Sequence, residues 1–469
     1  MRWKSHVRFG ERAGENGPAE MLAPRSGPTP RLRILILAAP MGDSFMLFRR
    51  VEVAVDVIVD RCAGLDVHKD TVMAAVRSPD GSGGRAEVVR EFSTFTADLV
   101  RLRHWLGEAG VSQVVMEATG VYWRPVWHVL EEHGRYELML VNARHVKNLP
   151  GRKTDAGDAS WLAQLLECGL LRGSFVPTQD MARLRDLTRY RTKLIQERTR
   201  EIQRVQKLLE DANIKLDSVI SDVMGKSARQ MLDALIAGGH DVEAMAQMAR
   251  TRMRPKIPQL RLALDGRFDE HHRLMLSMHL EHIDQLSSLI TGLDTKVDHL
   301  MAPFDEPATR LLSIPGVGKR TAETIIAEIG VDMSRFPTAG HLASWAGLCP
   351  GNDESAGKRR SGKARKGNQA LRTAMCEAAW AASHTKDTYL SVQYRRFKRR
   401  MGTKSEGKAI FAVAHTMIVI VWHLLHDDSS YQELGPDYFD KRNDVDARQR
   451  YLIRELEKLG NTVTLQPAA

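Results

Sequence analysis

Four acidic residues of this chain have types and positions that suit the binding of divalent metal ions. Asp66 follows the apolar residues of a short predicted strand, and Glu117 closes a second apolar run at 111–117. Asp155 and Asp158 are three residues apart at the start of a helical pattern, so they share one face of that helix. Carboxylates at two strand ends and on one helix can converge on hard, oxygen-liganded cations such as Mg²⁺ or Mn²⁺. This pattern predicts phosphodiester chemistry.

The alternative is that each acid is an ordinary solvated residue. Asp155 or Asp158 alone would fit that interpretation, because Asp is common at helix starts. Asp66 and Glu117 do not, since an acid at the exit of an apolar strand is unfavourable unless it binds something. The set therefore favours a metal site. Three histidines are expected to be structural bystanders: His68, His128 and His145.

The elements that must position these acids alternate between strands and helices from residue 56 to 178. Two predicted strands flank the turn signal at 80–84, and the later strands end near Glu117 and residue 141. The helix that begins at Asp155 runs to about residue 166. Three hairpin-linked strands followed by alternating helices and strands predict an α/β domain of the RNase H-like class.

The rest of the chain divides into four further regions. Residues 1–55 are rich in Gly, Pro and Arg and predict a disordered extension; an alternative start at Met41 or Met46 would place most of it outside the native protein. Residues 179–303 predict a helical, coiled-coil region, and residues 304–426 a mainly α domain. Residues 427–469 predict a tail helix.

Two arms of the helical region carry apolar residues at heptad spacing. The repeating positions are Leu187 and Leu194; Ile195, Ile202 and Leu209; Leu276, Ile283, Ile290 and Val297; and Leu286, Leu293 and Leu300. The arms could fold back as an antiparallel coiled coil, pair between subunits, or belong to an ordinary helical bundle.

A glycine-rich turn opens a helix in the sequence Ile-Pro-Gly-Val-Gly-Lys at 314–319. This is typical of a helix-hairpin-helix. Gly316 and Gly318 would let the backbone approach a phosphate, next to the free N–H groups of the helix start and to Lys319. The alternative is a helix–helix turn that binds nothing.

A basic segment follows, and it contains two serines. Between residues 358 and 408 there are fifteen Lys and Arg but three acids, a net charge of +12 that exceeds the +10 of the whole chain. Such concentration indicates a polyanion-binding surface. Ser355 and Ser361 lie in its Gly-rich loop, where cations could stabilise the charge of an attacking serine or contact only backbone phosphates. The expected nucleic-acid contacts are Lys358, Arg359, Arg360, Lys363, Arg365, Lys366 and Arg372.

Other classes of protein are disfavoured by composition. The four cysteines have no metal-ligand spacing, which argues against structural zinc and fits a reducing cytosol. No apolar run approaches the ~20 residues of a membrane helix, so no membrane partner is expected. We expect a cytoplasmic, nucleoid-associated protein.

Several motifs together resemble the DEDD transposases of the bacterial insertion-sequence family called IS-one-ten, with its Piv-like invertase relatives. They are Gly-Leu-Asp-Val-His-Lys at 64–69, Met-Glu-Ala-Thr-Gly at 116–120, Lys-Thr-Asp-Ala-Gly-Asp-Ala at 153–159, Ile-Pro-Gly-Val-Gly at 314–318, Trp-Ala-Gly-Leu-Cys-Pro at 345–350, and Lys-Gly-Asn with Leu-Arg at 366–372. The resemblance covers roughly residues 60–460.

The resemblance implies a RuvC-like domain that carries the four acids and a C-terminal transposase domain that carries a nucleophilic serine. Ser355 matches that serine by position, although this chain has Ser-Ala-Gly where the family usually has Ser-Gly, which leaves Ser361-Gly as a rival. The family also implies Mg²⁺, a 5′-phosphoserine link to DNA, a bridge RNA as guide, and dimers that assemble into a tetramer with shared active sites.

The resulting hypothesis is a DNA recombinase that cuts and rejoins double-stranded DNA at the ends of a mobile element and at its target. The main alternative is a metal-dependent endonuclease of the Holliday-junction type in which water attacks. A third is a DNA-binding protein without catalysis.

Overall fold

The computed structural model describes residues 31–35, 50–54, 57–118, 120–132, 134–142, 146, 155–239, 241–351, 353–355, 358–402, 405–441 and 445–465. The chain divides into two compact units, and the boundary in the sequence lies between Val176 and Pro177. The helical region and the mainly α domain that the sequence separates at residues 303 and 304 belong to one of these units.

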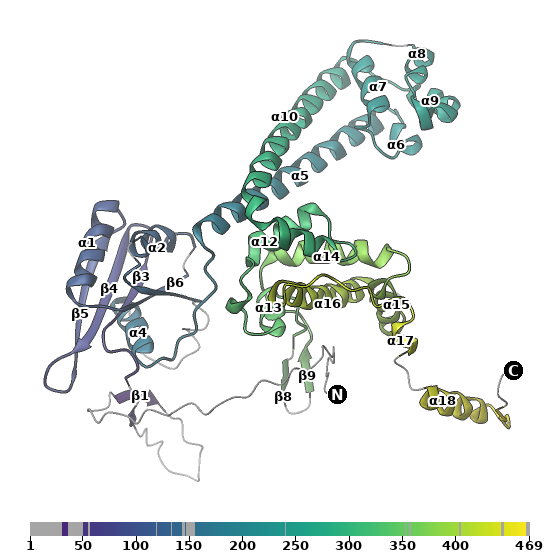
Figure 1. Ribbon diagram of the computed structural model, residues 1–469. Coiled ribbons are helices and arrows are strands. Elements are labelled where there is room, and N and C mark those ends of the chain that lie inside the picture. The colour runs from purple at the N-terminus through teal and green to yellow at the C-terminus, as the bar shows by residue number, and fades with distance from the viewer. Residues whose placement is uncertain are drawn as a thin grey trace, which may run out of the picture. The chain divides into compact units, whose positions relative to one another are not determined.

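The N-terminal unit is built on a mixed five-stranded sheet with the order β5-β4-β3-β6-β7 (Figure 1). β4 is antiparallel to both of its neighbours, whereas β6 is parallel to β3 and β7 is parallel to β6. The strands are β3 (Cys62–Val67), β4 (Thr71–Pro79), β5 (Arg85–Ser93), β6 (Gln113–Glu117) and β7 (Glu137–Val141). This arrangement is compatible with an RNase H-like α/β domain.

Helices cover both faces of this sheet. α1 (Thr96–Glu108) and α2 (Trp123–Glu131) pack on one face, where Leu65 and Met116 meet leucines of both helices. α4 (Asp155–Glu167) packs on the other, where Val115 meets Leu162. Because side chains alternate along a strand, each strand serves both layers.

The predicted hairpin between β4 and β5 is confirmed. Asp80 Oδ1 accepts hydrogen bonds from the backbone N–H groups of Ser82 and Gly84, each at 2.8 Å. An Asp side chain that bonds backbone two residues on is the usual way an Asx turn closes. Ahead of this domain, β1 (Arg31–Leu35) and β2 (Arg50–Ala54) form an antiparallel pair that the sequence did not predict, and the rest of residues 1–49 lies outside the described residues.

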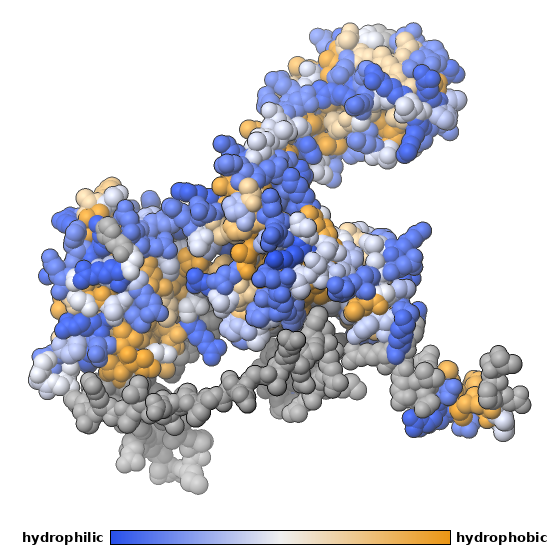
Figure 2. Space-filling model, in the orientation of Figure 1, coloured by the Kyte–Doolittle hydropathy of each residue, from blue (hydrophilic) through white to orange (hydrophobic). Residues whose placement is uncertain are grey.

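The C-terminal unit begins with an arm of two long helices, α5 (Gln179–Asp211) and α10 (Glu270–Met301), each about 50 Å long. They are antiparallel within one chain, because Arg191 pairs with Asp294, Glu201 with His279, and Asp211 with His272. The predicted heptad row of α10 faces inward: Leu276, Ile283, Ile290 and Val297 are all buried. The visible face of the arm is mostly hydrophilic (Figure 2).

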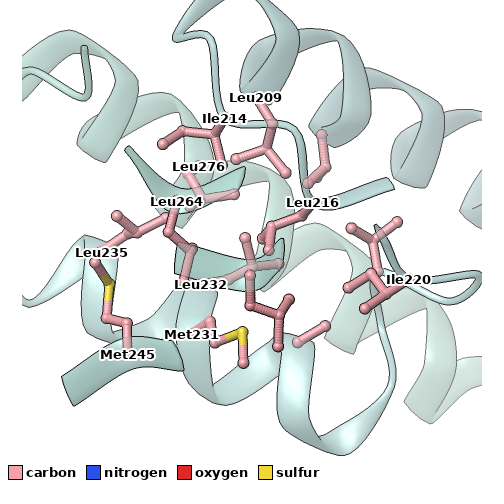
Figure 3. Close-up of a cluster of buried hydrophobic side chains, with 14 of the residues drawn as sticks. Leu209, Ile214, Leu216, Ile220, Met231, Leu232, Leu235, Met245, Leu264 and Leu276 are labelled. Atoms are coloured by element: carbon pink, nitrogen blue, oxygen red, sulfur yellow. The ribbon is translucent and has the colours of Figure 1, made fainter. Parts of the chain in front are cut away.

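Short helices close the far end of the arm. They are α6 (Leu216–Val219), α7 (Lys226–Ile236), α8 (Val242–Gln247), the 3₁₀ helix η1 (Thr251–Lys256) and α9 (Ile257–Leu264). Their apolar side chains converge with those of α5 and α10 in a separate core, in which Leu216, Met231 and Leu232 are fully or almost fully buried (Figure 3).

A further group of helices lies on α16 (Glu406–His426), ten of whose 21 residues are buried, or on the helices packed against it. They are α11 (Asp305–Leu312), α12 (Lys319–Ile329), α13 (Ala339–Trp345), α14 (Gln369–His384) and α15 (Tyr389–Met401), with 3₁₀ turns η2 (Ala302–Phe304) and η3 (Met333–Arg335). The chain ends with α17 (Tyr438–Lys441) and α18 (Val445–Lys458).

The expectation that no apolar run approaches membrane-spanning length was wrong for α16. Among the described helices, this one is long and apolar enough to qualify by length and composition, and half of its apolar window is buried in the protein. Its histidines interrupt the run in the sequence. Burial against α13, α14 and α15 explains why a core helix has this composition.

Candidate functional site

Two of the four acids lie at neighbouring positions on adjacent parallel strands. Asp66 is the next-to-last residue of β3 and is 8% exposed, and Glu117 is the last residue of β6. The β3–β6 register pairs Leu65 with Met116, so Asp66 and Glu117 each stand one position further along. Adjacent strands are about 4.8 Å apart, which places these two backbone positions side by side.

Both acids belong to the face of the sheet that α4 covers. Cys62 and Val115 pack with leucines of α4, whereas Leu65 and Met116 pack on the opposite face. Side chains alternate along a strand, so Asp66 shares its face with Cys62 and Glu117 shares its face with Val115.

The way that α4 lies on β3 brings the helix start toward Asp66. The Cys62 thiol donates to the carbonyl of Ala163 at 3.4 Å. Two residues along β3, Gly64 is so close to the helix that a Cβ there would stand 2.2 Å from the carbonyl oxygen of Ala159. Each step of two residues along β3 thus moves about one turn toward the start of α4. By the same step, the next residue on this face, Asp66, is level with the first turn of α4, which begins at Asp155 and includes Asp158.

The predicted metal site would draw its carboxylates from β3, β6 and α4. Asp66, Glu117 and Asp158 are described, and the backbone of Asp155 begins α4, but the Asp155 side chain lies outside the described residues. Within the described part of the chain, no three His, Cys, Asp or Glu side chains are already close enough to hold a metal ion. The donor set suits a hard cation, because all four predicted ligands are carboxylates.

His68 was expected to be a bystander, but it contacts one of the predicted ligands. Its Nε2 atom lies 3.1 Å from Asp66 Oδ2, with 59% of the imidazole exposed. The Asp-Val-His spacing at the end of a strand was the signal for this contact, since residues two apart share a face. His128 has only a 4.0 Å approach to Glu131, and His145 lies outside the described residues.

Cys62 lies on the same face but cannot supply a nucleophile at neutral pH. Burial, followed by the nearby Glu167 carboxylate, raises the pKa of its thiol to about 12. Glu167 is fully buried and pairs with Arg77 at 2.9 Å and with Arg85. The thiol therefore stays protonated and serves the packing of α4.

The predicted nucleophile lies on a small hairpin of the C-terminal unit. β8 (Asp353–Ser355) pairs with β9 (Lys358–Ser361), with Ser355 opposite Lys358 and Ser361 opposite Asp353. Ser355 therefore stands at the turn end of the hairpin and Ser361 at its base. The side chains of both serines lie outside the described residues.

Most of the predicted nucleic-acid contacts near this hairpin are exposed. Lys358, Lys363, Arg365 and Lys366 face solvent, whereas Arg372 is half-buried and donates to Gln369. The side chains of Arg359 and Arg360 lie outside the described residues.

The segments on either side of the hairpin are fixed at its base. Gly347 and Gly367 touch, and a Cβ on Gly367 would stand 2.3 Å from the Gly347 nitrogen. Asn368 follows at once. Its Oδ1 atom caps α14 by accepting from the Leu371 N–H at 3.1 Å, and its Nδ2 atom donates to Glu328 Oε2 at 2.6 Å.

Glu328 connects this anchor to the arm. It is fully buried on α12, and its carboxylate accepts two hydrogen bonds from Arg189 on α5, at 2.6 and 2.8 Å. Arg185 pairs with the same carboxylate at 3.2 Å. One buried acid thus ties α5, α12 and the start of α14 together, a junction that the sequence did not reveal.

At the predicted helix-hairpin-helix, the structure has α11, a turn and α12. Gly316 has a φ of +87°, and a Cβ there would stand 2.3 Å from the carbonyl of Ala378 on α14, so packing requires this glycine. At Gly318 a Cβ would meet open space. Lys319 is exposed and pairs with Asp298 at 2.7 Å. Contact of this turn with a phosphate stays a prediction.

Comparisons with known proteins match transposases both in the region of the acids and in the region of the β8–β9 hairpin. Residues 63–214 match the family of DEDD transposases of IS110 elements, described as "Transposase", and residues 308–395 match the "Transposase IS116/IS110/IS902 family". A 43.6 kDa protein of insertion element IS110 from Streptomyces coelicolor is 29% identical over 308 residues, which cover 61% of this chain and 74% of the relative. A 42 kDa protein of IS900 from Mycobacterium paratuberculosis is 27% identical over 63% of this chain and 78% of the relative.

The chain belongs to the IS110 family of transposases. It is therefore an enzyme of DNA recombination and transposition, and DNA is its partner. A further relative of this IS110-family transposase is the pilin gene-inverting protein of Moraxella bovis, 28% identical over 160 residues, which cover 33% of this chain and 48% of the relative.

Proposed function

We propose that this transposase cuts and rejoins DNA through a covalent bond between a serine and the 5′ phosphate, with Ser355 as the nucleophile and Asp66, Glu117, Asp155 and Asp158 as ligands of Mg²⁺ or Mn²⁺. The observation that carries the proposal is the alignment of carboxylates on one face of the sheet: neighbouring strand positions for Asp66 and Glu117, and the start of α4 level with Asp66.

The chemistry balances without any further reactant. Ser355 Oγ attacks phosphorus, a bond from Oγ to phosphorus forms, and the bond to the 3′ oxygen breaks. The serine proton leaves with that oxygen as a 3′ hydroxyl. In rejoining, another 3′ hydroxyl attacks the phosphoserine and regenerates the serine. A bound divalent cation would stabilise negative charge on the phosphate oxygens.

Each residue of the proposed site then has a defined role. The four carboxylates would hold the cation, and His68 would restrain Asp66 through their 3.1 Å contact. The exposed Lys358, Lys363, Arg365 and Lys366 bind backbone phosphates beside the hairpin that carries Ser355. Gly318 and Lys319 add a contact at the start of α12, with Gly316 shaping the turn by its packing on α14.

The rival is hydrolysis, in which water replaces the serine. The relative named as gene-inverting favours rejoining, because a gene can be inverted only if every cut strand is resealed. Guidance by a bridge RNA, assembly of dimers into a tetramer and association with the nucleoid rest on the family resemblance alone.

The experiment is to incubate the protein with DNA that carries the ends of its own element and the adjoining transcript, then to look for protein–DNA adducts under denaturing conditions. We expect an adduct with the native protein and none with Ser355→Ala, whereas Ser361→Ala keeps it. Glu117→Gln should lose both adduct and cleavage. Cleavage that persists in Ser355→Ala without an adduct would establish water as the nucleophile, and loss in Ser361→Ala alone would move the role to that serine.

A further inference from the structure

A tryptophan on α14 is exposed without any structural need. The side chain of Trp380 is 48% exposed, while each of the other described tryptophans is buried or half-buried. α14 packs on α12, α15 and α16 through a row of small and apolar residues that includes Leu371, Met375 and Ala379. Trp380 lies outside that row, so the fold would lose little if this ring were removed.

The ring belongs to an outer line of α14 that begins just after the β8–β9 hairpin. This line contains Gln369, Thr373, Cys376, Trp380 and His384, spaced three or four residues apart. Its members are exposed or half-buried. A large aromatic side chain at the end of a polar line is typical of a contact surface.

His384 holds the indole in a defined position. The two ring centres are 4.6 Å apart with the planes inclined at 55°. His384 Nδ1 lies 2.8 Å from the Trp380 carbonyl oxygen, so the protonated nitrogen donates to it and fixes the imidazole. A pair of rings that is restrained before binding can accept a flat ligand at a low entropic cost.

The pair belongs to a strongly basic segment of the chain, which favours an anionic partner. Trp380 and His384 lie inside the segment 358–408 with its net charge of +12. The segment has three acids. Glu377 and Asp387 are exposed and lie three residues from Trp380 and His384, whereas Glu406 is already occupied by Lys398 at 2.8 Å and by the Tyr394 hydroxyl at 2.6 Å. Positive charge combined with an exposed aromatic face is how proteins bind single-stranded nucleic acid without reading its sequence.

We propose that Trp380 and His384 form a stacking platform for an unpaired DNA base. In a duplex the faces of a base are covered by its neighbours, so a protein ring can stack only on a base that has left the helix. Strand exchange produces such bases, because cut strands must leave one partner before they pair with another. The inference rests on the action of the chain on DNA and is independent of which group attacks the phosphate.

The test is equilibrium binding in EDTA, where no cleavage can occur, to a labelled DNA duplex and to the same duplex with a short mismatched bubble. We expect Trp380→Ala to weaken binding to the bubble on the order of tenfold, as is typical of one lost base stack, and to leave binding to the intact duplex unchanged. Trp380→Phe should retain most of the affinity. Tyr190→Ala removes a similarly exposed ring from α5 and should change neither affinity.

Three results would overturn the platform. These are equal losses on both DNAs, a loss that occurs with an RNA bubble but not with DNA, and a change in the oligomeric state of Trp380→Ala by sedimentation. The last would identify the ring as a contact between copies of the chain. Since the assay needs neither metal nor serine, failure of the adduct experiment would leave its outcome unaffected.

Discussion

Replacing Gly64 by alanine tests whether the seating of α4 positions the acids. The new Cβ would lie 2.2 Å from the Ala159 carbonyl and 2.5 Å from the Ala163 nitrogen, whereas real Cβ contacts essentially never fall below 3.0 Å. Both atoms belong to the helix backbone, so no side chain can rotate away. We therefore expect α4 to retreat by about 0.8 Å at this point, the difference between the two distances.

That displacement is large for a metal site and modest for the fold. Overpacking of a core typically costs about 1–3 kcal/mol, which leaves most domains folded. A misplacement of about 1 Å can cost about 100-fold in rate, so strand cleavage by Gly64→Ala should fall to roughly that extent. The loss should be partly recovered at higher Mg²⁺ or Mn²⁺, because the ligands remain and only their spacing has changed.

The matched control is Val76→Ala, a buried residue of β4 on the opposite face, against α1. It should lower the unfolding temperature without moving α4 and should keep its cleavage rate. The assay pairs thermal unfolding with single-turnover cleavage at several metal concentrations. The reasoning is refuted if Gly64→Ala cleaves within threefold of the native protein, or if Val76→Ala loses as much activity at an equal loss of stability.

Three further predictions concern the rest of the chain. Glu328→Gln removes the buried charge that pairs with Arg185 and Arg189, so we expect about 3 kcal/mol of destabilisation in urea unfolding. Asp180→Asn, at an exposed pair, should change little; equal effects of the two substitutions would contradict the role of Glu328 as a junction. DNA affinity should fall steeply with salt, and Lys363→Ala should reduce the slope of the log–log plot by about 1; an unchanged slope would remove Lys363 from the binding surface. Burial of Glu201 opposes its ionisation, but hydrogen bonds from His279 and Arg204 outweigh this and hold its pKa below the usual 4.5. A carboxylate whose pKa is lower in the folded state stabilises the fold at any pH above its unfolded pKa, and this stabilisation is lost as the pH falls through the folded pKa. The unfolding temperature of the native protein should therefore decline below pH 4.5, and the decline should be smaller in Glu201→Gln.

The sequence predicted the strands and turns of the N-terminal unit because local rules govern them. Asp80 and the glycines that follow it predict the hairpin turn. Asp66 and Glu117 lie at the ends of apolar strands, and the parallel pairing of these strands brings the two ends together. The seating of α4 could not be foreseen, because it depends on the absence of a side chain at Gly64 opposite a segment almost one hundred residues away.

In the arm of α5 and α10, the sequence predicted only the apolar part of the packing. Apolar spacing predicted the inward row of α10, but the inner face of α5 also contains Thr188, Arg191 and Glu201, which an apolar pattern does not count. These polar residues are buried because each finds a partner, such as Asp294 and Glu323 for Arg191. A charged residue in a heptad position is informative only when its partner is known, and the partner here comes from another helix.

The return path of the arm has an evolutionary consequence. Since α5 leads outward and α10 leads back to the same base, everything between Asp211 and Glu270 is a detour whose entry and exit are neighbours. The two family matches cover residues 63–214 and 308–395, so most of this detour lies between them. Because entry and exit are neighbours, the length and content of the tip can change without displacing the bases of α5 and α10, and exchange of the tip between relatives is a route to chimaeric enzymes.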